Sequence, residues 1–328
     1  MRRRTFFAAG LTAVSAAIGG SSADRGIENA LFGDATAEPV SLRLLGGQVA
    51  AAERTLEAAG LGELNRRLPR LLSTARATWE AVTGSAKERA ASLFSRALSV
   101  TSQQQIRVSR ESIASVAADR AARYAELAGD PVAMAGAARN QAVVLRRAGS
   151  PLADKVMIDA AELLRAETAL RGADSAGMYG KILASAAYTA AGHDDRDAAA
   201  EYLSAAGGAI EPFGDTPRLA RADLDVFAVS CDRVLGDYGS ALHHAHAVDL
   251  QAVPEAHERG RYWQDVGLAA HGRGRIDLAI EALAELDQTA PQYLHHRPWS
   301  RRLVEDLLYT REGGSSPLLH RLGARYGL

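Results

Sequence analysis

The sequence predicts an all-α fold, and three observations support this prediction. Alanine dominates the apolar residues, and alanine is the strongest helix former. Runs rich in valine and isoleucine, which are typical of strands, are scarce. From Pro39 onward, glycine or proline interrupts the helical apolar pattern at intervals of roughly fifteen to twenty residues. We therefore expect a long succession of helices.

Thirteen helices are expected between Pro39 and the C-terminal region. Their expected ranges are residues 40–59, 62–82, 85–99, 104–128, 131–148, 151–168, 173–191, 196–210, 217–235, 238–249, 254–272, 276–289 and 296–311. Residues 39–328 are predicted to form one helical-repeat domain, and residues 1–38 a flexible tail or signal-like segment.

The opening residues, MRRRTFFAAGLTAVSAAIGGSS, fit two interpretations. Arg3 and Arg4 precede a phenylalanine pair and a short apolar segment, as in a twin-arginine export signal. That segment is too short to span a membrane in the mature protein. In the other interpretation, an arginine-rich start leads into a linker, because residues 24–38 are small and polar.

An internal repeat is clearest in the stretch ERGRYWQDVGLAAHGRGRIDLAIEALAELDQTAP. Trp263, Gly267, Gly274, Ala279 and Pro291 fall at the spacings of a tetratricopeptide repeat. The expected roles follow from packing. The tryptophan fills the space between two paired helices, and Gly267 and Ala279 allow their close approach. Gly274 ends the first helix and Pro291 the second.

Weaker copies of this repeat lie upstream, with Gly149, Gly192 and Gly236 at the expected turns. These glycines are spaced more widely than the roughly 34 residues of an ideal repeat. Such units cannot bury their apolar faces alone, so stacked neighbours share a core. The predicted architecture is a tetratricopeptide-like superhelix, that is, an α-solenoid.

Two stretches carry a family resemblance: residues 112–149, SIASVAADRAARYAELAGDPVAMAGAARNQAVVLRRAG, and residues 252–310, which begin AVPEAHERGRYWQDVG. They resemble the tetratricopeptide-like C-terminal region of actinobacterial XRE-class transcriptional regulators. In that family a helix-turn-helix domain and a linker precede the sensor region, and RRRTFFAAGLTAVSAAIGG is similar to such a linker. The resemblance implies a cytoplasmic role in transcriptional regulation or signalling.

The chain departs from this family because no helix-turn-helix pattern is visible in it. We therefore expect either a freestanding sensor, with a DNA-binding protein acting in trans, or a chain that starts late. Direct nucleic-acid binding is not expected. The formal net charge is −1, and aromatic residues that could stack on bases make up only 5% of the chain.

No residue pattern supports an enzyme, a cofactor or a metal site. The sequence lacks a G-x-S-x-G elbow and the glycine-rich phosphate loops. Cys231 is the single cysteine, which excludes an internal disulfide, and its apolar helical context predicts a buried structural thiol. His243 and His246 lie one helical turn apart without a third ligand at a matching spacing.

The remaining candidate is a binding surface on the concave side of the solenoid, which the first helix of each pair would line. The repeat register predicts that the groove residues are Arg139, Arg146, Tyr179, Arg233, Arg261, Gln264 and His271. Arginine and glutamine can bind the backbone carbonyls or an acidic group of an extended peptide. We therefore predict a non-catalytic regulatory module that recognises a peptide or a protein partner.

Three alternatives remain open. The first is a twin-arginine-exported tetratricopeptide scaffold of the cell envelope. The second is an enzyme whose active site uses scattered residues. In the third, the chain forms a homodimer through its terminal helices, with Trp299 and Leu303 in an apolar interface.

Overall fold

The structure is a computed structural model that describes residues 22–33 and 36–328. These residues form seventeen α-helices and one short 3₁₀ helix, with no strand among them, which confirms the all-α prediction. No described helix is long and apolar enough to cross a membrane. Arg3, Arg4 and the apolar segment after them lie outside the described residues.

Most of the helices begin and end close to the predicted positions. They are α1 (Ser22–Phe32), α2 (Leu42–Glu57), α3 (Leu61–Ala81), α4 (Ser85–Arg107), α5 (Glu111–Ala128), α6 (Pro131–Arg147), α7 (Leu152–Thr168), α8 (Ala173–Gly192), α9 (Arg196–Ile210), η1 (Glu211–Phe213), α10 (Arg221–Val234), α11 (Tyr238–Ala245), α12 (Ala256–Gly272), α13 (Ile276–Thr289), α14 (Pro291–His295), α15 (Pro298–Leu308), α16 (Arg311–Gly314) and α17 (Pro317–Tyr326). Local signals explain the agreement. The carboxylates of Asp130 and Asp195, for example, accept the backbone N–H groups of Ala133 and Ala198 and so cap α6 and α9.

The predicted boundaries fail in three places. Residues 24–38 were expected to be a linker, yet they include most of α1, whose Ile27 and Leu31 are buried in the N-terminal core. Helix α4 continues to Arg107, so the break before α5 lies later than expected. At the C-terminal end, α14, α16 and α17 were not predicted. The four missed helices have eleven residues or fewer, and helices that short depend on tertiary packing for their stability.

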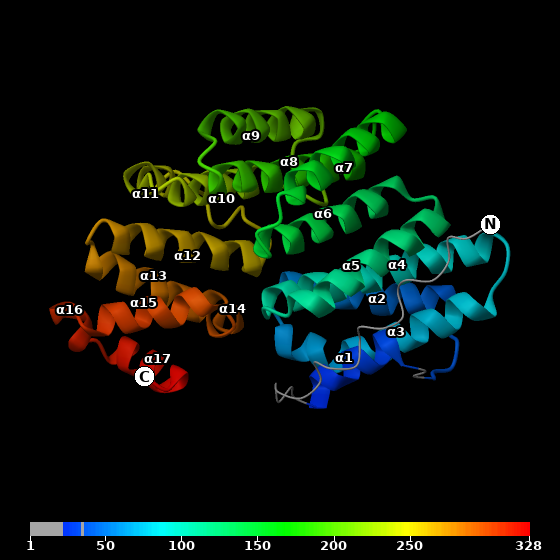
Figure 1. The fold of residues 1–328 in the computed structure, drawn as a ribbon, viewed down its shortest axis with the longest axis horizontal. Helices are drawn as coiled ribbons and strands as arrows, with labels where there is room; N and C mark the ends of the chain where they lie inside the picture. Colours follow the sequence, from blue (N-terminus) through cyan, green and yellow to red (C-terminus); the bar gives the residue numbers. More distant parts are fainter. Residues whose placement is uncertain (1–21, 34–35) are drawn as a thin grey trace, which may run out of the picture.

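The helices form two rows (Figure 1). The inner row contains α2, α4, α6, α8, α10 and α12, and each contacts the next. The outer row contains α3, α5, α7, α9, α11 and α13, and each packs on the inner helix that precedes it. Alanine dominates the buried positions between the rows, so the helices approach one another closely.

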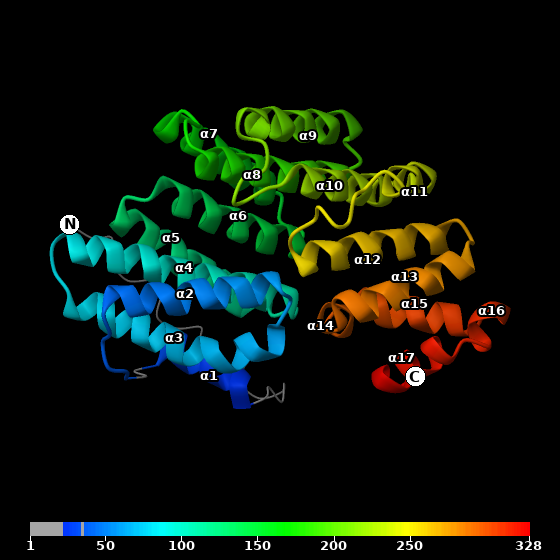
Figure 2. The ribbon, with the colours of Figure 1, turned by 180° about the vertical axis from the view of Figure 1, so that it is seen from behind.

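The two ends of this arch meet, so the inner row closes on itself (Figure 2). Helix α12 contacts α2, and α14 contacts α3. The side-chain oxygen of Gln292 accepts the backbone N–H of Gly62 at 2.7 Å. Ala59 is buried in the core of the C-terminal helices. The inner helices therefore surround a central space.

The C-terminal pair α12 and α13 shows most of the features predicted from its repeat. A Cβ atom at Gly267 would lie 3.4 Å from the Cβ of Ala282, so the helices approach closely there. Gly274 has a φ of +69° in the turn, where a side chain would be strained. Ala279 is fully buried, and α13 ends just before Pro291. Gly149 and Gly236 adopt the same turn conformation, but Asp194 replaces Gly192 in this role.

Two of the packing predictions are wrong. Trp263 is only partly buried at the margin of the C-terminal core, and the neighbouring Tyr262 is the buried aromatic residue. The Tyr262 hydroxyl donates to the carbonyl of Ala245, which fixes its inward position. Leu303 is 2% exposed within the same core, where α12 and α17 pack against its helix. It is therefore not available as an interface residue.

Candidate ligand-binding cavity

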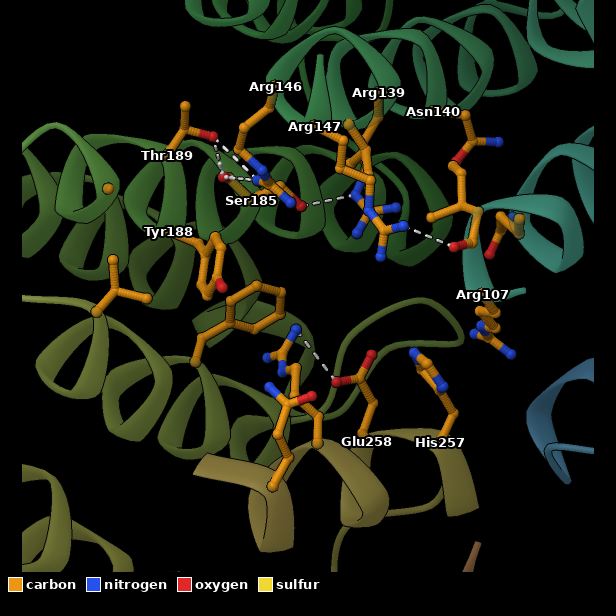
Figure 3. A pocket seen from close by; sticks show the side chains of 18 of the residues that line it. Arg107, Arg139, Asn140, Arg146, Arg147, Ser185, Tyr188, Thr189, His257 and Glu258 are labelled. Carbon is orange, nitrogen blue, oxygen red and sulfur yellow. Dashed lines mark hydrogen bonds and ion pairs between the residues drawn. The ribbon is translucent and has the colours of Figure 1, made fainter. Parts of the chain in front are cut away.

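A cavity of about 520 Å³ lies in the central space that the inner helices surround (Figure 3). We call it the basic cavity. Helices α4, α6 and α8 form one side of it, and α10, α12, α14 and Arg297 form the other. A second cavity of about 270 Å³, here called the mixed cavity, adjoins it and shares Gln103, Arg107, Arg139, Asn140 and Lys181. The shared residues make the two cavities parts of one continuous groove.

Five of the seven predicted groove residues line the basic cavity, and they are Arg139, Arg146, Arg233, Arg261 and Gln264. The prediction succeeded for these residues because the helical register of each inner helix fixes which side faces the centre. The same helices also contribute polar residues that the repeat register did not identify.

Tyr179 and His271 do not line the cavity. The cavity-facing residues of α8 include Lys181 and Ser185, and Tyr179 precedes Lys181 by two positions. Two helical positions correspond to a rotation of about 200°, so Tyr179 packs instead in a hydrophobic core. His271 follows Gln264 by seven residues on the same side of α12, which places it about 10 Å further along the helix, beyond the cavity.

The prediction missed several residues of the cavity. They are Arg107, Asn140, Arg147, Lys181, Tyr188, His257, Glu258, Tyr293 and Arg297. Part of this set had a signal in the sequence. In the alanine-rich helix α8, Lys181, Ser185, Tyr188 and Thr189 form a polar stripe at helical spacing. Arg107 and Arg297 had no such signal, because both lie at helix ends whose positions depend on how the arch closes.

The two cavities differ in charge. Seven arginines and Lys181 line the basic cavity, and Glu258 is its single acidic residue within the described part of the chain. The mixed cavity has five basic and five acidic lining residues in the same described ranges. Positive charge is therefore concentrated in one half of the groove.

Two cavity arginines of α6, Arg139 and Arg146, have neutral partners. The Nε group of Arg139 donates to the hydroxyl of Ser185 at 2.7 Å. Arg146 donates to the hydroxyl of Thr189 at 3.0 Å and to the carbonyl of Ser185 at 3.3 Å. Its guanidinium also lies 4.7 Å from the ring centre of Tyr188.

Burial and like charges disfavour the charged form of these two α6 arginines. Burial lowers the pKa of Arg139 to about 10; nearby Glu258 opposes this shift, and Arg146 and Arg261 add to it. Burial also lowers the pKa of Arg146; Tyr188 opposes that shift, and Arg147 and Arg261 reinforce it. Arg139 therefore stays protonated at neutral pH, and the hydrogen-bond partners of Arg139 and Arg146 among the described residues are hydroxyl and carbonyl oxygens rather than carboxylates.

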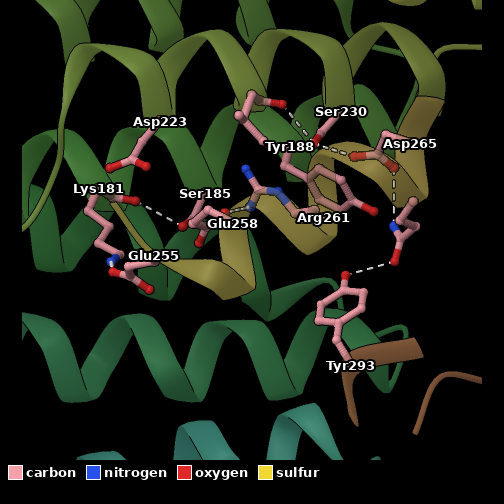
Figure 4. Close-up of polar contacts among 12 residues, drawn as sticks. Lys181, Ser185, Tyr188, Asp223, Ser230, Glu255, Glu258, Arg261, Asp265 and Tyr293 are labelled. Carbon is pink, nitrogen blue, oxygen red and sulfur yellow. Dashed lines mark hydrogen bonds and ion pairs between the residues drawn. The ribbon is translucent and has the colours of Figure 1, made fainter. Parts of the chain in front are cut away.

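The opposite side of the cavity holds a buried carboxylate network (Figure 4). Asp265 is fully buried and accepts the Nε group of Arg233 at 2.8 Å. It also accepts hydrogen bonds from Ser230 and from the amide of Gln264. The Tyr293 hydroxyl donates to the amide oxygen of Gln264 at 2.8 Å. Gln264 therefore uses both ends of its amide within the protein.

The same network stabilises the charge of Arg233. Burial lowers the pKa of Arg233, but the carboxylate of Asp265 outweighs burial, so the pKa is raised. The second guanidinium nitrogen of Arg233 reaches the Tyr188 hydroxyl at 3.2 Å. Tyr188 thus contacts arginines from both sides of the cavity.

Arg261 combines a charged partner with free donors. Its guanidinium lies 3.8 Å from the ring centre of Phe227 and 3.4 Å from a carboxylate oxygen of Glu258. Burial lowers the pKa of Arg261, and Glu258 and Asp265 more than compensate. Its Nε and Nη2 atoms are buried without a hydrogen-bond partner among the described residues.

Other buried hydrogen-bond donors of the cavity also lack an acceptor. Within residues 22–33 and 36–328, the amide nitrogen of Asn140 and the Nε atom of Arg297 find no hydrogen-bond acceptor. The Nδ1 atom of His257 is also buried without a partner in this part of the chain. Burial, followed by the charges of Arg107 and Arg297, lowers the pKa of His257 well below its usual value, so the ring is neutral at pH 7.

Glu255 links three helices at the junction of the two cavities. It precedes α12, and its carboxylate lies 3.4 Å from the amino group of Lys181 on α8 and 3.9 Å from the guanidinium of Arg107 on α4. Arg107 also donates to the carbonyl of Leu56 at 2.6 Å. Lys181, and then Arg107, lower the pKa of Glu255 despite its burial. These contacts hold the two ends of the arch together.

Burial raises the pKa of the Cys231 thiol to about 12, which keeps it protonated. The described residues contain no group of three histidine, cysteine or acidic side chains that could hold a metal ion. No protein-family model matches the chain, and no curated protein matches it. Conclusions about function therefore rest on the cavity itself.

Proposed function

We propose that this chain is a non-catalytic binding module that takes a peptide segment, free or belonging to a partner protein, into the central groove. The observation that carries the proposal is the continuous groove formed by the basic and mixed cavities, which inner helices from α2 to α12 line. An elongated groove suits an extended chain better than a compact molecule. Aromatic faces and amide groups between the charged side chains suit a peptide backbone.

We also propose that the helix pairs are tetratricopeptide-like repeats and that the two rows form a superhelix. The close approach at Gly267 and the turn at Gly274 support this assignment, as does the alternation of inner and outer helices. In such solenoids, each unit contacts only its neighbours, so small changes between units add up to a change in curvature.

The proposed mechanism is a population shift. The ends of the arch are joined by a few polar contacts, chiefly those of Glu255, Arg107 and Gln292. A ligand that contacts both sides of the groove binds the closed arch better than an open one, and it therefore shifts the population toward closure. The closed form would then present a different surface to a regulatory partner.

The regulatory context rests on the family resemblance, which suggests transcriptional regulation or signalling in the cytoplasm, with a DNA-binding protein acting in trans. The twin-arginine-like opening supports one alternative, an exported scaffold of the cell envelope. Replacing Arg3 and Arg4 by lysine distinguishes the two. Loss of export in cell fractionation would support the scaffold, whereas an unchanged cytoplasmic protein would contradict it.

A peptide-display selection on the purified full-length protein tests the binding module. We expect peptides that are enriched on the wild type and lost on the Arg146→Glu variant, because the reversed charge lies inside the groove. The Arg325→Glu variant is the matched control, since Arg325 pairs with Asp287 at the surface. Circular dichroism and thermal melting verify that both variants fold. Equal enrichment on Arg146→Glu and the wild type, or no enrichment at all, would contradict the proposal.

A further inference from the structure

The basic cavity holds more positive charge than the protein itself neutralises. Its lining has eight cationic side chains. Four carboxylates lie within ion-pair distance of them, from Glu111, Glu255, Glu258 and Asp265. Among the described residues the cationic side chains therefore exceed these carboxylates by four, because Lys181 and Arg107 share Glu255 and three arginines have no carboxylate partner. Charges in a partly buried cavity interact strongly, because water screens them less than at an open surface.

The uncompensated charges lie on both sides of the cavity. Arg139 and Arg146 come from α6, and Arg297 lies on the opposite side at the start of α15. Within the described chain these three arginines have no ion pair with a carboxylate. Figure 3 shows Arg139 and Arg146 projecting from α6 into the space that faces Glu258 and His257 of α12.

Hydrogen-bond donors without acceptors occur in the same place. Asn140 is 2% exposed and its amide nitrogen has no partner in the described ranges. The same holds for the Nε and Nη2 atoms of Arg261 and the Nε atom of Arg297. Buried donors are nearly always paired in folded proteins, and leaving them unpaired is unfavourable. Excess charge and unpaired donors together indicate a missing acceptor that carries negative charge.

We propose that the basic cavity is a binding site for the oxyanion groups of a ligand, carboxylate or phosphate, and that the bound anions bridge α6 and α12. A metal cation would be repelled, whereas the forked donors of arginine match the oxygen atoms of carboxylates and phosphates. The inference rests on the proposed binding function, and it specifies that function: the ligand is acidic, and its acidic part lies in the basic cavity rather than in the mixed one.

Two sources supply this chemistry, namely the acidic side chains or C-terminus of a peptide and a small free anion. Calorimetric titration and thermal melting of the full chain distinguish them. The ligands used are pyrophosphate, citrate and hexaglutamate, with hexaglutamine as the uncharged peptide, and sodium chloride keeps the ionic strength constant. We expect saturable binding and a rise in melting temperature with the anions and not with hexaglutamine.

The variants Arg146→Gln and Arg139→Gln/Arg146→Gln remove charge from the cavity. The control Arg325→Gln removes one surface charge that is paired with Asp287. We expect the double variant to bind the anions at least roughly tenfold more weakly, because two charge-assisted interactions are lost, and the single variant to lie between it and the wild type. The control should bind as the wild type does. Each variant must give a circular dichroism spectrum close to that of the wild type, which shows that it folds.

The outcomes separate the oxyanion site from the peptide proposal. Saturable binding of hexaglutamate that depends on Arg139 and Arg146 supports both. Binding of citrate or pyrophosphate alone supports the oxyanion site and counts against a peptide ligand. Equal binding of hexaglutamine and hexaglutamate supports a peptide groove and overturns the oxyanion site. Anion binding that is absent, or unchanged in the double variant, also overturns the oxyanion site.

Discussion

Arginines on the two sides of the basic cavity differ in the groups that they contact and in the direction of their pKa shifts. On α6, Arg139 and Arg146 contact hydroxyl and carbonyl oxygens, and burial lowers their pKa values. On α10 and α12, Arg233 and Arg261 contact carboxylates, and their pKa values are raised. The same type of side chain thus has a structural role where it pairs with a buried carboxylate, as Arg233 does, and is left available for a ligand where it does not, as in Arg139 and Arg146.

The difference follows from where the acidic residues lie. A buried ion pair is costly to break, because removing one partner leaves an uncompensated charge. An arginine that has only neutral partners in a cavity gains little from its charge until an anion binds. Arginines with paired charges should therefore matter most for folding, and those with neutral partners should matter most for binding. Four predictions test this division, from the largest expected effect to the smallest.

The largest effect is expected from Asp265→Asn. The substitution leaves Arg233 buried without a carboxylate, so the free energy of unfolding should fall by about 3–5 kcal/mol. Urea unfolding followed by circular dichroism measures the change. The double variant Asp265→Asn/Arg233→Gln should recover part of the loss. A loss below about 1 kcal/mol would mean that the Asp265–Arg233 pair contributes no more than a weak surface pair. It would then contradict the proposed difference between arginines with carboxylate partners and arginines with neutral partners.

A smaller, pH-dependent effect is expected at Asp223 on α10. Burial, and then the charge of Glu258, raises its pKa to about 6, although the N–H of Ala220 donates to it. The folded state therefore favours the protonated carboxyl more than the unfolded state does. Stability from this group is present at low pH and is lost as the pH rises from about 4 through about 6.

Asp223→Asn removes this ionisation and can retain the contact with Ala220 through its amide oxygen. The variant should be more stable than the wild type by up to about 3 kcal/mol at pH 8, and the difference should approach zero near about pH 4. Unfolding titrations across this pH range measure the difference. An Asn variant that is less stable at pH 8 would show that Asp223 is ionised and compensated in the fold, like Asp265.

Glu255→Gln should weaken the contact between the ends of the arch. Its contacts with Lys181 and Arg107 are long, at 3.4 and 3.9 Å, and a glutamine oxygen still accepts a hydrogen bond from Lys181, so the loss of stability should be about 1 kcal/mol. Hydrogen exchange should be faster at the amide of Gly62, which lies in the same junction. Substitution of the surface pair member Asp287 by Asn provides a comparison, and it should leave the Gly62 exchange rate unchanged. Equal exchange in wild type and Glu255→Gln would mean that Gln292 alone holds the junction.

The smallest effect on folding is expected from Arg139→Gln. The loss of a hydrogen bond to Ser185 is offset by relief of an unfavourable buried charge, so stability should change by less than about 1 kcal/mol. Urea unfolding at pH 7 gives the value. Destabilisation comparable to that of Asp265→Asn would show that Arg139 is a structural residue and would erase the proposed division between the two sides.

Much of the secondary structure could be predicted because its signals are local. Asp130 before Pro131 starts α6, and Gly274 ends the turn after α12, whatever the rest of the chain does. The helical register then identified the inward side, which is why Arg139, Arg146 and Arg261 were correctly placed at the centre. Tyr179 failed because the weaker repeat gave a register that was wrong by half a turn.

The sequence by itself determined most of the helices, most of their ends and the inward side of α6, α10 and α12, where the predicted arginines line the cavity. Only the tertiary structure decided that the arch closes, that Arg107 and Arg297 join the cavity, and that Asp265 pairs with Arg233 while Arg139 has no carboxylate. The physical reason is distance along the chain. A helix forms through contacts within one or two turns, whereas burial and charge compensation depend on residues that only the completed fold brings together.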